Sequence, residues 1–167
     1  MKIINKLIFF FCFGLIILFI SCDRDQPTCE TCYPEIFRCK INGVFWEPYC
    51  SPDPPFGCNP TRLQYYDNSK FLELTTRNDK TTEGFHLVIR KLDESGKNKF
   101  ETGSIYANDT KSPACLIFNL DTSEVSYLIV KKIDRQNRVI ISEFSFVAKN
   151  SCNEQVTITE GYFDLTY

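Results

Sequence analysis

From residue 35 onward, apolar and polar residues alternate in short segments that are rich in Phe, Tyr, Ile, Val and Thr. Turn-forming clusters of Asn, Asp, Ser and Gly separate these segments, for example at 93–96 and 134–137. A period of two is typical of strands with one buried face, and no window has the 3.6-residue period of an amphipathic helix. The pattern predicts a single all-β domain over 35–167, an antiparallel β-sandwich or flattened barrel of about ten short strands with no long helix.

The first hairpin can be assigned residue by residue. The dipeptide Asn42-Gly43 favours a tight type I′ turn, which sets the pairing of the strands on either side. The predicted cross-strand pairs are Ile41 with Val44, Cys39 with Trp46, and Arg38 with Glu47. One face of the hairpin is then apolar and consists of Phe37, Cys39, Ile41, Val44 and Trp46, while Phe45 lies on the mostly charged face.

The final segment changes phase part-way along. Val156 and Ile158 share one parity, whereas Phe163 and Leu165 share the other. A one-residue slip would turn the second hydrophobic set away from the core. We therefore expect a β-bulge at Glu160-Gly161, since Gly is favoured at such positions.

The first 21 residues have the organisation of an export signal. Lys2 and Lys6 precede an apolar run over 7–20, which ends in Ser21-Cys22. A basic start, an apolar centre and a small residue before the break predict a signal peptide over 1–21. The run is shorter than the ~20 apolar residues of a spanning helix, and an uncleaved membrane anchor is the alternative.

The residues at the end of this signal point to lipidation. The stretch Phe19-Ile20-Ser21-Cys22 resembles the bacterial lipobox, with Phe in place of the usual Leu. The resemblance implies cleavage before Cys22 and attachment of a lipid to that cysteine. Each buried CH₂ of the acyl chains would contribute ~0.8 kcal/mol to membrane binding. We expect a lipoprotein in the cell envelope, anchored to the outer membrane on its periplasmic or surface side, with a polar tether over 22–34.

The charge of the chain argues against nucleic-acid binding. The full chain has a net charge of −2, and the mature part is more acidic because Lys2 and Lys6 leave with the signal. Its basic residues form no clustered face that could follow a phosphate backbone.

The nine cysteines predict disulfides. Cys12 leaves with the signal and Cys22 carries the lipid, so an odd number remains in an oxidising compartment. At least one thiol is then free or is paired with another molecule. Sequence alone does not select the connectivity. The spacing favours two bridges, Cys50–Cys58 across a proline-rich loop and Cys115–Cys152.

The motif Cys29-Glu30-Thr31-Cys32 has two chemical interpretations beside a structural disulfide. A C-x-x-C pair can be a redox centre or half of a zinc site, but a redox pair is usually placed at the start of a helix. Here the pair lies in the tether, and the one histidine, His86, is far away in a predicted strand. We favour a structural disulfide, with a thiol oxidoreductase as the alternative function.

No catalytic residues, metal site or cofactor are predicted. The chain has no nucleophile-elbow motif, and no carboxylate pair has a spacing that suggests a shared site. His86 alternates with Phe85 and Leu87 and is expected on the more polar face of its strand.

A group of aromatic residues is the best candidate for binding. The loop over 48–60 carries Tyr49 and Phe56, and Tyr65-Tyr66 follow closely. Prolines and a disulfide would pre-organise this loop and lower the ordering cost of binding. The alternative is that Phe56 covers a sheet end and one of the two adjacent tyrosines belongs to the core. We expect a binding or structural module with a glycan or protein partner, or a subunit of a surface complex.

Both ends of the domain are similar to those of a known group of proteins. The stretch 37–46 contains a strand, an Asn-Gly turn and a Trp, while 142–146 and 156–163 contain a Phe-x-Phe strand followed by a Thr-x-Gly-x-Phe strand. These features resemble a family of uncharacterised Bacteroidota-type lipoproteins. The resemblance implies an envelope compartment and a β fold, and it carries no activity. The extra cysteines and the proline-rich loop depart from the family pattern.

Overall fold

The computed structural model describes residues 35–51, 59–101 and 105–167, all within one compact unit. The expected signal peptide, the lipidated Cys22, the tether with Cys29 and Cys32, and the loop residues Phe56 and Cys58 lie outside the described residues. Nothing in the described part of the chain forms a helix of membrane-spanning length and hydropathy.

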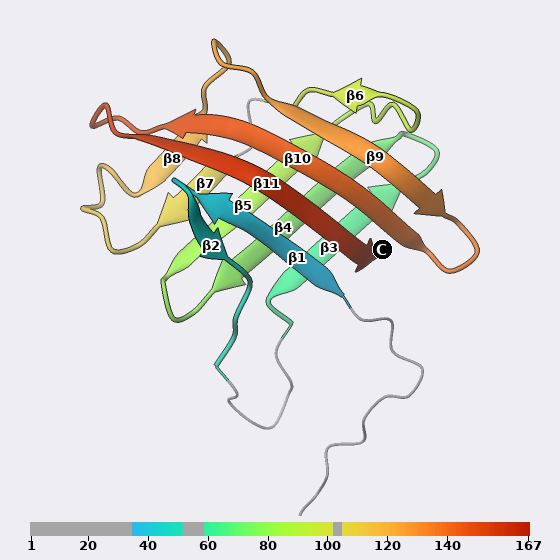
Figure 1. Ribbon diagram of the computed structural model, residues 1–167, viewed down its shortest axis with the longest axis horizontal. Helices are drawn as coiled ribbons and strands as arrows, with labels where there is room; N and C mark the ends of the chain where they lie inside the picture. Colours follow the sequence, from blue (N-terminus) through green and yellow to red (C-terminus); the bar gives the residue numbers. More distant parts are fainter. Residues whose placement is uncertain (1–34, 52–58, 102–104) are drawn as a thin grey trace, which may run out of the picture. The chain divides into compact units, whose positions relative to one another are not determined.

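The described residues form an all-β structure of eleven strands without a helix (Figure 1). The fold class predicted from the alternation is therefore confirmed. The strands are β1 (Ile36–Ile41), β2 (Val44–Trp46), β3 (Thr61–Tyr66), β4 (Phe71–Asn78), β5 (Glu83–Ile89), β6 (Lys97–Asn98), β7 (Ile105–Asn108), β8 (Ile117–Leu120), β9 (Tyr127–Asp134), β10 (Val139–Lys149) and β11 (Gln155–Thr166).

All strand pairs of the sheet are antiparallel, in the order β2-β1-β11-β10-β8-β7-β5-β4-β3. The N-terminal hairpin therefore pairs with the C-terminal strand, so that Ile36 lies opposite Asp164. One edge of β10 is shared, because β9 pairs with its first half and β8 with its end. The sheet curls into a half-barrel in which β1, β11 and β10 cross over β3, β4 and β5 (Figure 1).

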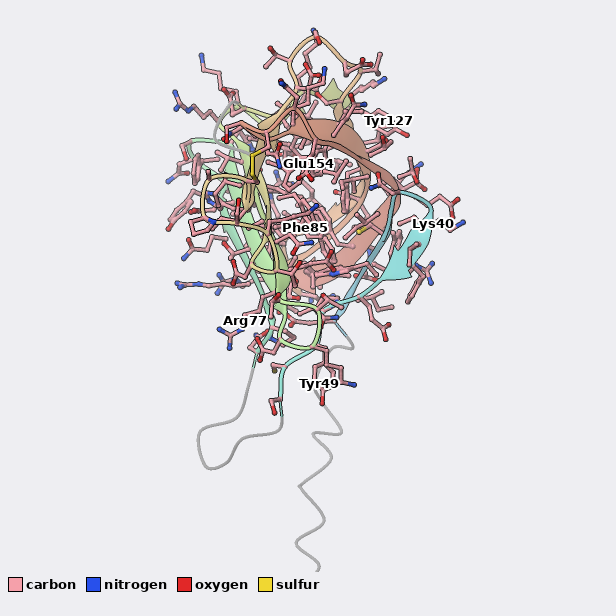
Figure 2. The ribbon with its side chains drawn as sticks, turned by 90° about the vertical axis from the view of Figure 1, so that its left-hand side faces the viewer. Lys40, Tyr49, Arg77, Phe85, Tyr127 and Glu154 are labelled. Carbon is pink, nitrogen blue, oxygen red and sulfur yellow. A yellow bond between two sulfur atoms is a disulfide. The ribbon has the colours of Figure 1, made fainter. Side chains whose placement is uncertain are left out.

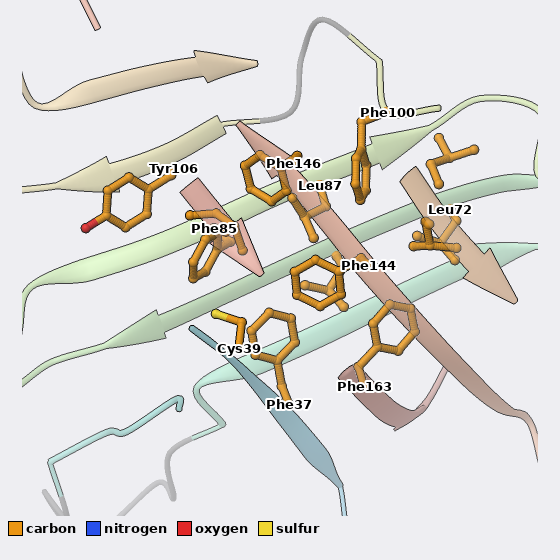
Figure 3. Close-up of a cluster of buried hydrophobic side chains, with 14 of the residues drawn as sticks. Phe37, Cys39, Leu72, Phe85, Leu87, Phe100, Tyr106, Phe144, Phe146 and Phe163 are labelled. Atoms are coloured by element: carbon orange, nitrogen blue, oxygen red, sulfur yellow. The ribbon is translucent and has the colours of Figure 1, made fainter. Parts of the chain in front are cut away.

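Aromatic side chains fill the space between the two walls of the half-barrel (Figure 3). Phe85 of β5 is at the centre, with ring centroids 5.9 Å from Phe37 and 4.9 Å from Trp46 on the opposite wall. It also contacts Phe146 of β10 at 6.2 Å. Edge-to-face and tilted pairs at these separations contribute beyond the area that they bury. The core thus joins the first hairpin to strands that follow it much later in the sequence.

The structure confirms most of the register predicted for the first hairpin. Ile41 pairs with Val44 and Cys39 with Trp46. The turn residues Asn42 and Gly43 have φ values of 49° and 82°, as a type I′ turn requires.

One detail of the predicted hairpin is wrong. β2 ends at Trp46, so Arg38 and Glu47 do not form a cross-strand pair. The Glu47 carbonyl instead accepts a hydrogen bond from the Asn78 amide at 2.8 Å, because the chain leaves β1 and crosses to β4. Val44 shares the face of Ile41 and Trp46, as predicted, although 71% of it is exposed.

The structure also contains the bulge expected in the last strand. The pairing of β11 shifts opposite Ser145, between Phe144 and Phe146 of β10. Glu160 lies in the bulge and adopts a left-handed backbone conformation, with a φ of 50°. Gly161 has a different role, because a Cβ at this position would lie 2.5 Å from the ring of Phe144. Glycine therefore makes room for a core aromatic ring directly after the bulge.

Candidate functional site

The aromatic residues predicted to form a binding loop do not lie together. Tyr49 bridges to Asn78 at the end of β4, whereas Tyr66 pairs with Phe71 at its beginning. Seven residues of extended strand separate these positions, a distance of about 23 Å. Tyr65 is buried, and its ring lies 5.2 Å from that of Tyr167. Phe56 lies outside the described residues.

The described part of the chain contains three disulfide-bonded cysteines and one free cysteine. Cys115 and Cys152 form the disulfide that their spacing favoured, with Cα atoms 5.5 Å apart. Cys50 is disulfide-bonded as well, and its favoured partner Cys58 lies outside the described residues. Cys39 is free and 2% exposed. Burial and the nearby Glu83 carboxylate raise the pKa of Cys39 to about 12, so that this thiol stays protonated and unreactive.

A cleft of about 570 Å³ lies at one end of the half-barrel. Figure 2 views the domain from this end and shows Phe85 between the two walls. The β1–β2 hairpin and the start of β11 contribute one side of the cleft, and the β4–β5 turn, β7 and β8 contribute the other. We call this opening the mouth. Ligand sites commonly occupy the mouths of β-barrels, in pockets of this size.

The floor of the mouth is aromatic and belongs to the core. Trp46, Tyr106 and Phe118 line it, and each is at most 4% exposed. The rim is apolar on one side, where Val44 and Phe45 of β2 are 71% and 59% exposed. β2 is an edge strand, and among the described residues only β1 pairs with it. The mouth thus combines a rigid floor with an accessible apolar rim.

Hydrogen-bonding groups converge on the wall formed by β5 and β7. The Tyr106 hydroxyl donates to the Glu83 carboxylate, and the Asn108 amide donates to the same carboxylate oxygen at 3.4 Å. Burial and the charge of Glu83 raise the pKa of Tyr106 above its ordinary range. The carboxylate therefore has a neutral phenol and an amide as its partners in the wall.

A single ion pair stands at the edge of the mouth. Lys111 Nζ lies 2.9 Å from Glu154 Oε1, and both side chains are about two-fifths exposed. This lysine lowers the pKa of Glu154. Because the two charges neutralise each other, the pair leaves no free cation at the cleft.

One buried donor in the floor has no partner. The Nε1 atom of Trp46 makes no hydrogen bond to any described residue, although the side chain is almost fully buried. An unsatisfied buried N–H costs about 1–3 kcal/mol, so such groups are rare in folded proteins.

The described residues offer no catalytic or metal-binding arrangement beside this cleft. No group of three or more His, Cys, Asp or Glu side chains within them could hold a metal ion. His86 lies on the outward face of β5, with Nε2 2.7 Å from the Glu73 carboxylate, as a cross-strand polar pair.

The mouth was not predicted from the sequence, although one signal was available. The register of the first hairpin already placed Phe45 on the charged face, where an aromatic residue is unexpected. Tyr106, Asn108 and Glu154 come from segments far apart in the chain, and only the curled sheet brings them to one opening.

No family model matches the chain, and neither a curated protein nor a solved structure is significantly similar to it. The resemblance to Bacteroidota-type lipoproteins therefore stays a prediction.

Proposed function

We propose that the protein is an exported, lipid-anchored envelope lipoprotein that binds a ligand in the mouth of its half-barrel without transforming it. The observation that carries this proposal is the mouth itself. Val44 and Phe45, both exposed, border a cleft whose floor consists of buried aromatic side chains. Outward positions of an edge strand are normally polar, because an exposed apolar edge invites aggregation. A rim of this kind is retained where it contacts something.

The disulfide supports the exported location. Cys115 and Cys152 tie the β7–β8 loop to the β10–β11 turn, next to the mouth. Disulfides persist in oxidising compartments, which agrees with export through the signal predicted over 1–21. Anchoring through Cys22 would hold the domain at a membrane.

Fluorescence of the one tryptophan tests the binding proposal directly. The 167-residue chain has a single Trp, and Trp46 lines the mouth. Full-length protein would be titrated with neutral oligosaccharides, acidic oligosaccharides and short uncharged peptides. We expect a saturable change in emission with at least one class, weakened in Phe45→Ala. Tyr66→Ala is the matched control, because Tyr66 is 53% exposed and pairs at the opposite end of β4.

Absence of a saturable change with all three classes would overturn the proposal. So would a response that Phe45→Ala and Tyr66→Ala weaken equally, because the ligand would then not depend on the mouth. The anchoring is tested separately, by metabolic labelling with radioactive palmitate. We expect the label on the wild type and its loss in Cys22→Ser, and a wild type without label contradicts lipidation.

A further inference from the structure

We infer that the ligand of the mouth is a neutral saccharide whose sugar ring packs against Phe45. This inference rests on the proposed binding function and specifies its ligand class. It depends on the charge of the cleft, on the mixture of its lining side chains, and on the exposed Phe45 at its rim.

The charge of the mouth disfavours anionic ligands. Its one lysine, Lys111, is paired with Glu154 at 2.9 Å. The remaining charged group is the Glu83 carboxylate, which would repel a phosphate or an acidic sugar. Recognition of anions needs unpaired Arg or Lys donors, and the lining of this cleft offers none.

The mixture of lining residues disfavours a purely apolar ligand. Amide, hydroxyl and carboxylate groups are part of the lining, and an acyl chain would bury them without replacing their water. The rim carries two amides and a hydroxyl, from Asn42, Gln155 and Thr81, and all three side chains are exposed. Asn42 accepts the Thr157 N–H through Oδ1 at 2.9 Å, which leaves its amide NH₂ group as a donor.

A neutral sugar matches both halves of this lining. Its hydroxyls both donate and accept, so they suit the amides of the rim. Its C–H face is apolar and can pack on an exposed aromatic ring such as Phe45, which is 59% exposed. The volume of about 570 Å³ falls within the range of small-molecule pockets.

The test separates the sugar from the other ligand classes. Full-length protein would be titrated with maltotriose, xylotriose and the trimer of N-acetylglucosamine, each followed by Trp46 fluorescence. We expect saturable binding of at least one neutral trisaccharide. Affinity should fall by about fivefold or more in Phe45→Ala, which removes the stacking surface. Gln155→Ala should weaken the same sugar, whereas Tyr66→Ala should leave its affinity unchanged.

Three results would overturn the inference. A response to the acidic oligosaccharides or the peptides alone would exclude a neutral sugar while leaving the binding function intact. Sugar binding that neither Phe45→Ala nor Gln155→Ala weakens would place the sugar away from the mouth. If no ligand class changes the Trp46 fluorescence, the proposed binding function is overturned as well. Phe45 and Gln155 are both exposed, so these variants keep the core intact and their results report on the cleft.

Discussion

The two ends of the half-barrel differ in the number of ion pairs that their side chains form. At the end away from the mouth, Arg135 and Lys70 lie between the carboxylates of Asp67 and Glu94, with N–O distances of 2.6–3.0 Å. The Tyr65 hydroxyl donates to Glu94 at 2.8 Å. We call these five residues the closed-end network. They connect the β3–β4 turn, the loop after β5 and the β9–β10 turn.

The mouth contains fewer ion pairs than the closed-end network. One ion pair, Lys111–Glu154, stands at its edge, and the Trp46 N–H in its floor has no partner among the described residues. The same sheet therefore joins its turns with several ion pairs at one end and leaves an exposed apolar rim at the other.

The largest expected effect is a difference in the free energy of unfolding between a variant under the floor of the mouth and a variant at its rim. Phe85→Ala removes the ring that packs against Trp46 and Phe37, and should lower the free energy of unfolding by about 3–5 kcal/mol. Val44→Ala at the 71% exposed rim should change it by less than about 0.5 kcal/mol. Urea unfolding measures both. Similar losses in the two variants would contradict a rim that is independent of the core.

The next effect concerns how the mouth is held together. Replacing Cys115 and Cys152 with serine opens a bridge across 37 residues and should cost about 2–4 kcal/mol, because the unfolded chain gains freedom. The control is Lys111→Gln, which breaks the ion pair between the same two segments and should cost much less. Guanidinium unfolding without reductant provides the comparison. A disulfide variant no less stable than the control would contradict this account.

Acid should act selectively on the closed end. Arg135 and Lys70, together with the Tyr65 hydroxyl, lower the pKa of Glu94 from 4.5 to about 2, and Arg135 holds the pKa of Asp67 well below its usual range. Depressed carboxyl pKa values stabilise the fold above the unfolded-state values, and this contribution disappears as the pH falls from about 4.5 towards 2.

Arg135→Gln tests this pH dependence. At pH 7 the variant should be less stable than the wild type, and the gap should close as the pH falls from about 4.5 to 2. Arg62→Gln, at an exposed arginine of β3, should show no such convergence. Urea unfolding midpoints of the wild type and both variants, measured at several pH values, give the stability gap at each pH. A gap for Arg135→Gln that stays constant down to pH 2 would refute the role of the network.

The smallest effect is expected at alkaline pH. Burial and the hydrogen bond to Glu94 raise the pKa of Tyr65 from 10.0 to about 12. A raised pKa keeps the phenol protonated in the fold, so its contribution is complete below pH 10 and is lost between about 10 and 12. The stability gap between wild type and Tyr65→Phe should therefore narrow over that interval, as measured by thermal unfolding. Tyr66→Phe should behave like the wild type, and equal behaviour of both variants would exclude a special role for Tyr65.

Local features of the fold could be predicted because they depend on neighbouring residues. The dipeptide Asn42-Gly43 imposes positive φ values, and the confirmed pairing of Cys39 with Trp46 follows from counting outward. The phase change before Phe163 requires an extra residue in β11 wherever that strand pairs. The candidate site depends on more distant relations. Trp46 and Tyr106 line one cleft although they lie on strands that share no pairing.

The amino-acid sequence by itself determined the all-β class, the first turn and the bulge, because alternation and turn chemistry act over a few residues. It also favoured the Cys115–Cys152 bridge through spacing alone. The tertiary structure decided that Cys39 is a buried free thiol, that Tyr65 belongs to the core, and that four distant segments meet at the mouth. These outcomes depend on the pairing of β1 with β11, which joins residues more than a hundred positions apart. Which surfaces a curled sheet buries and which it leaves open follows from such long-range pairing, and no local pattern contains that information.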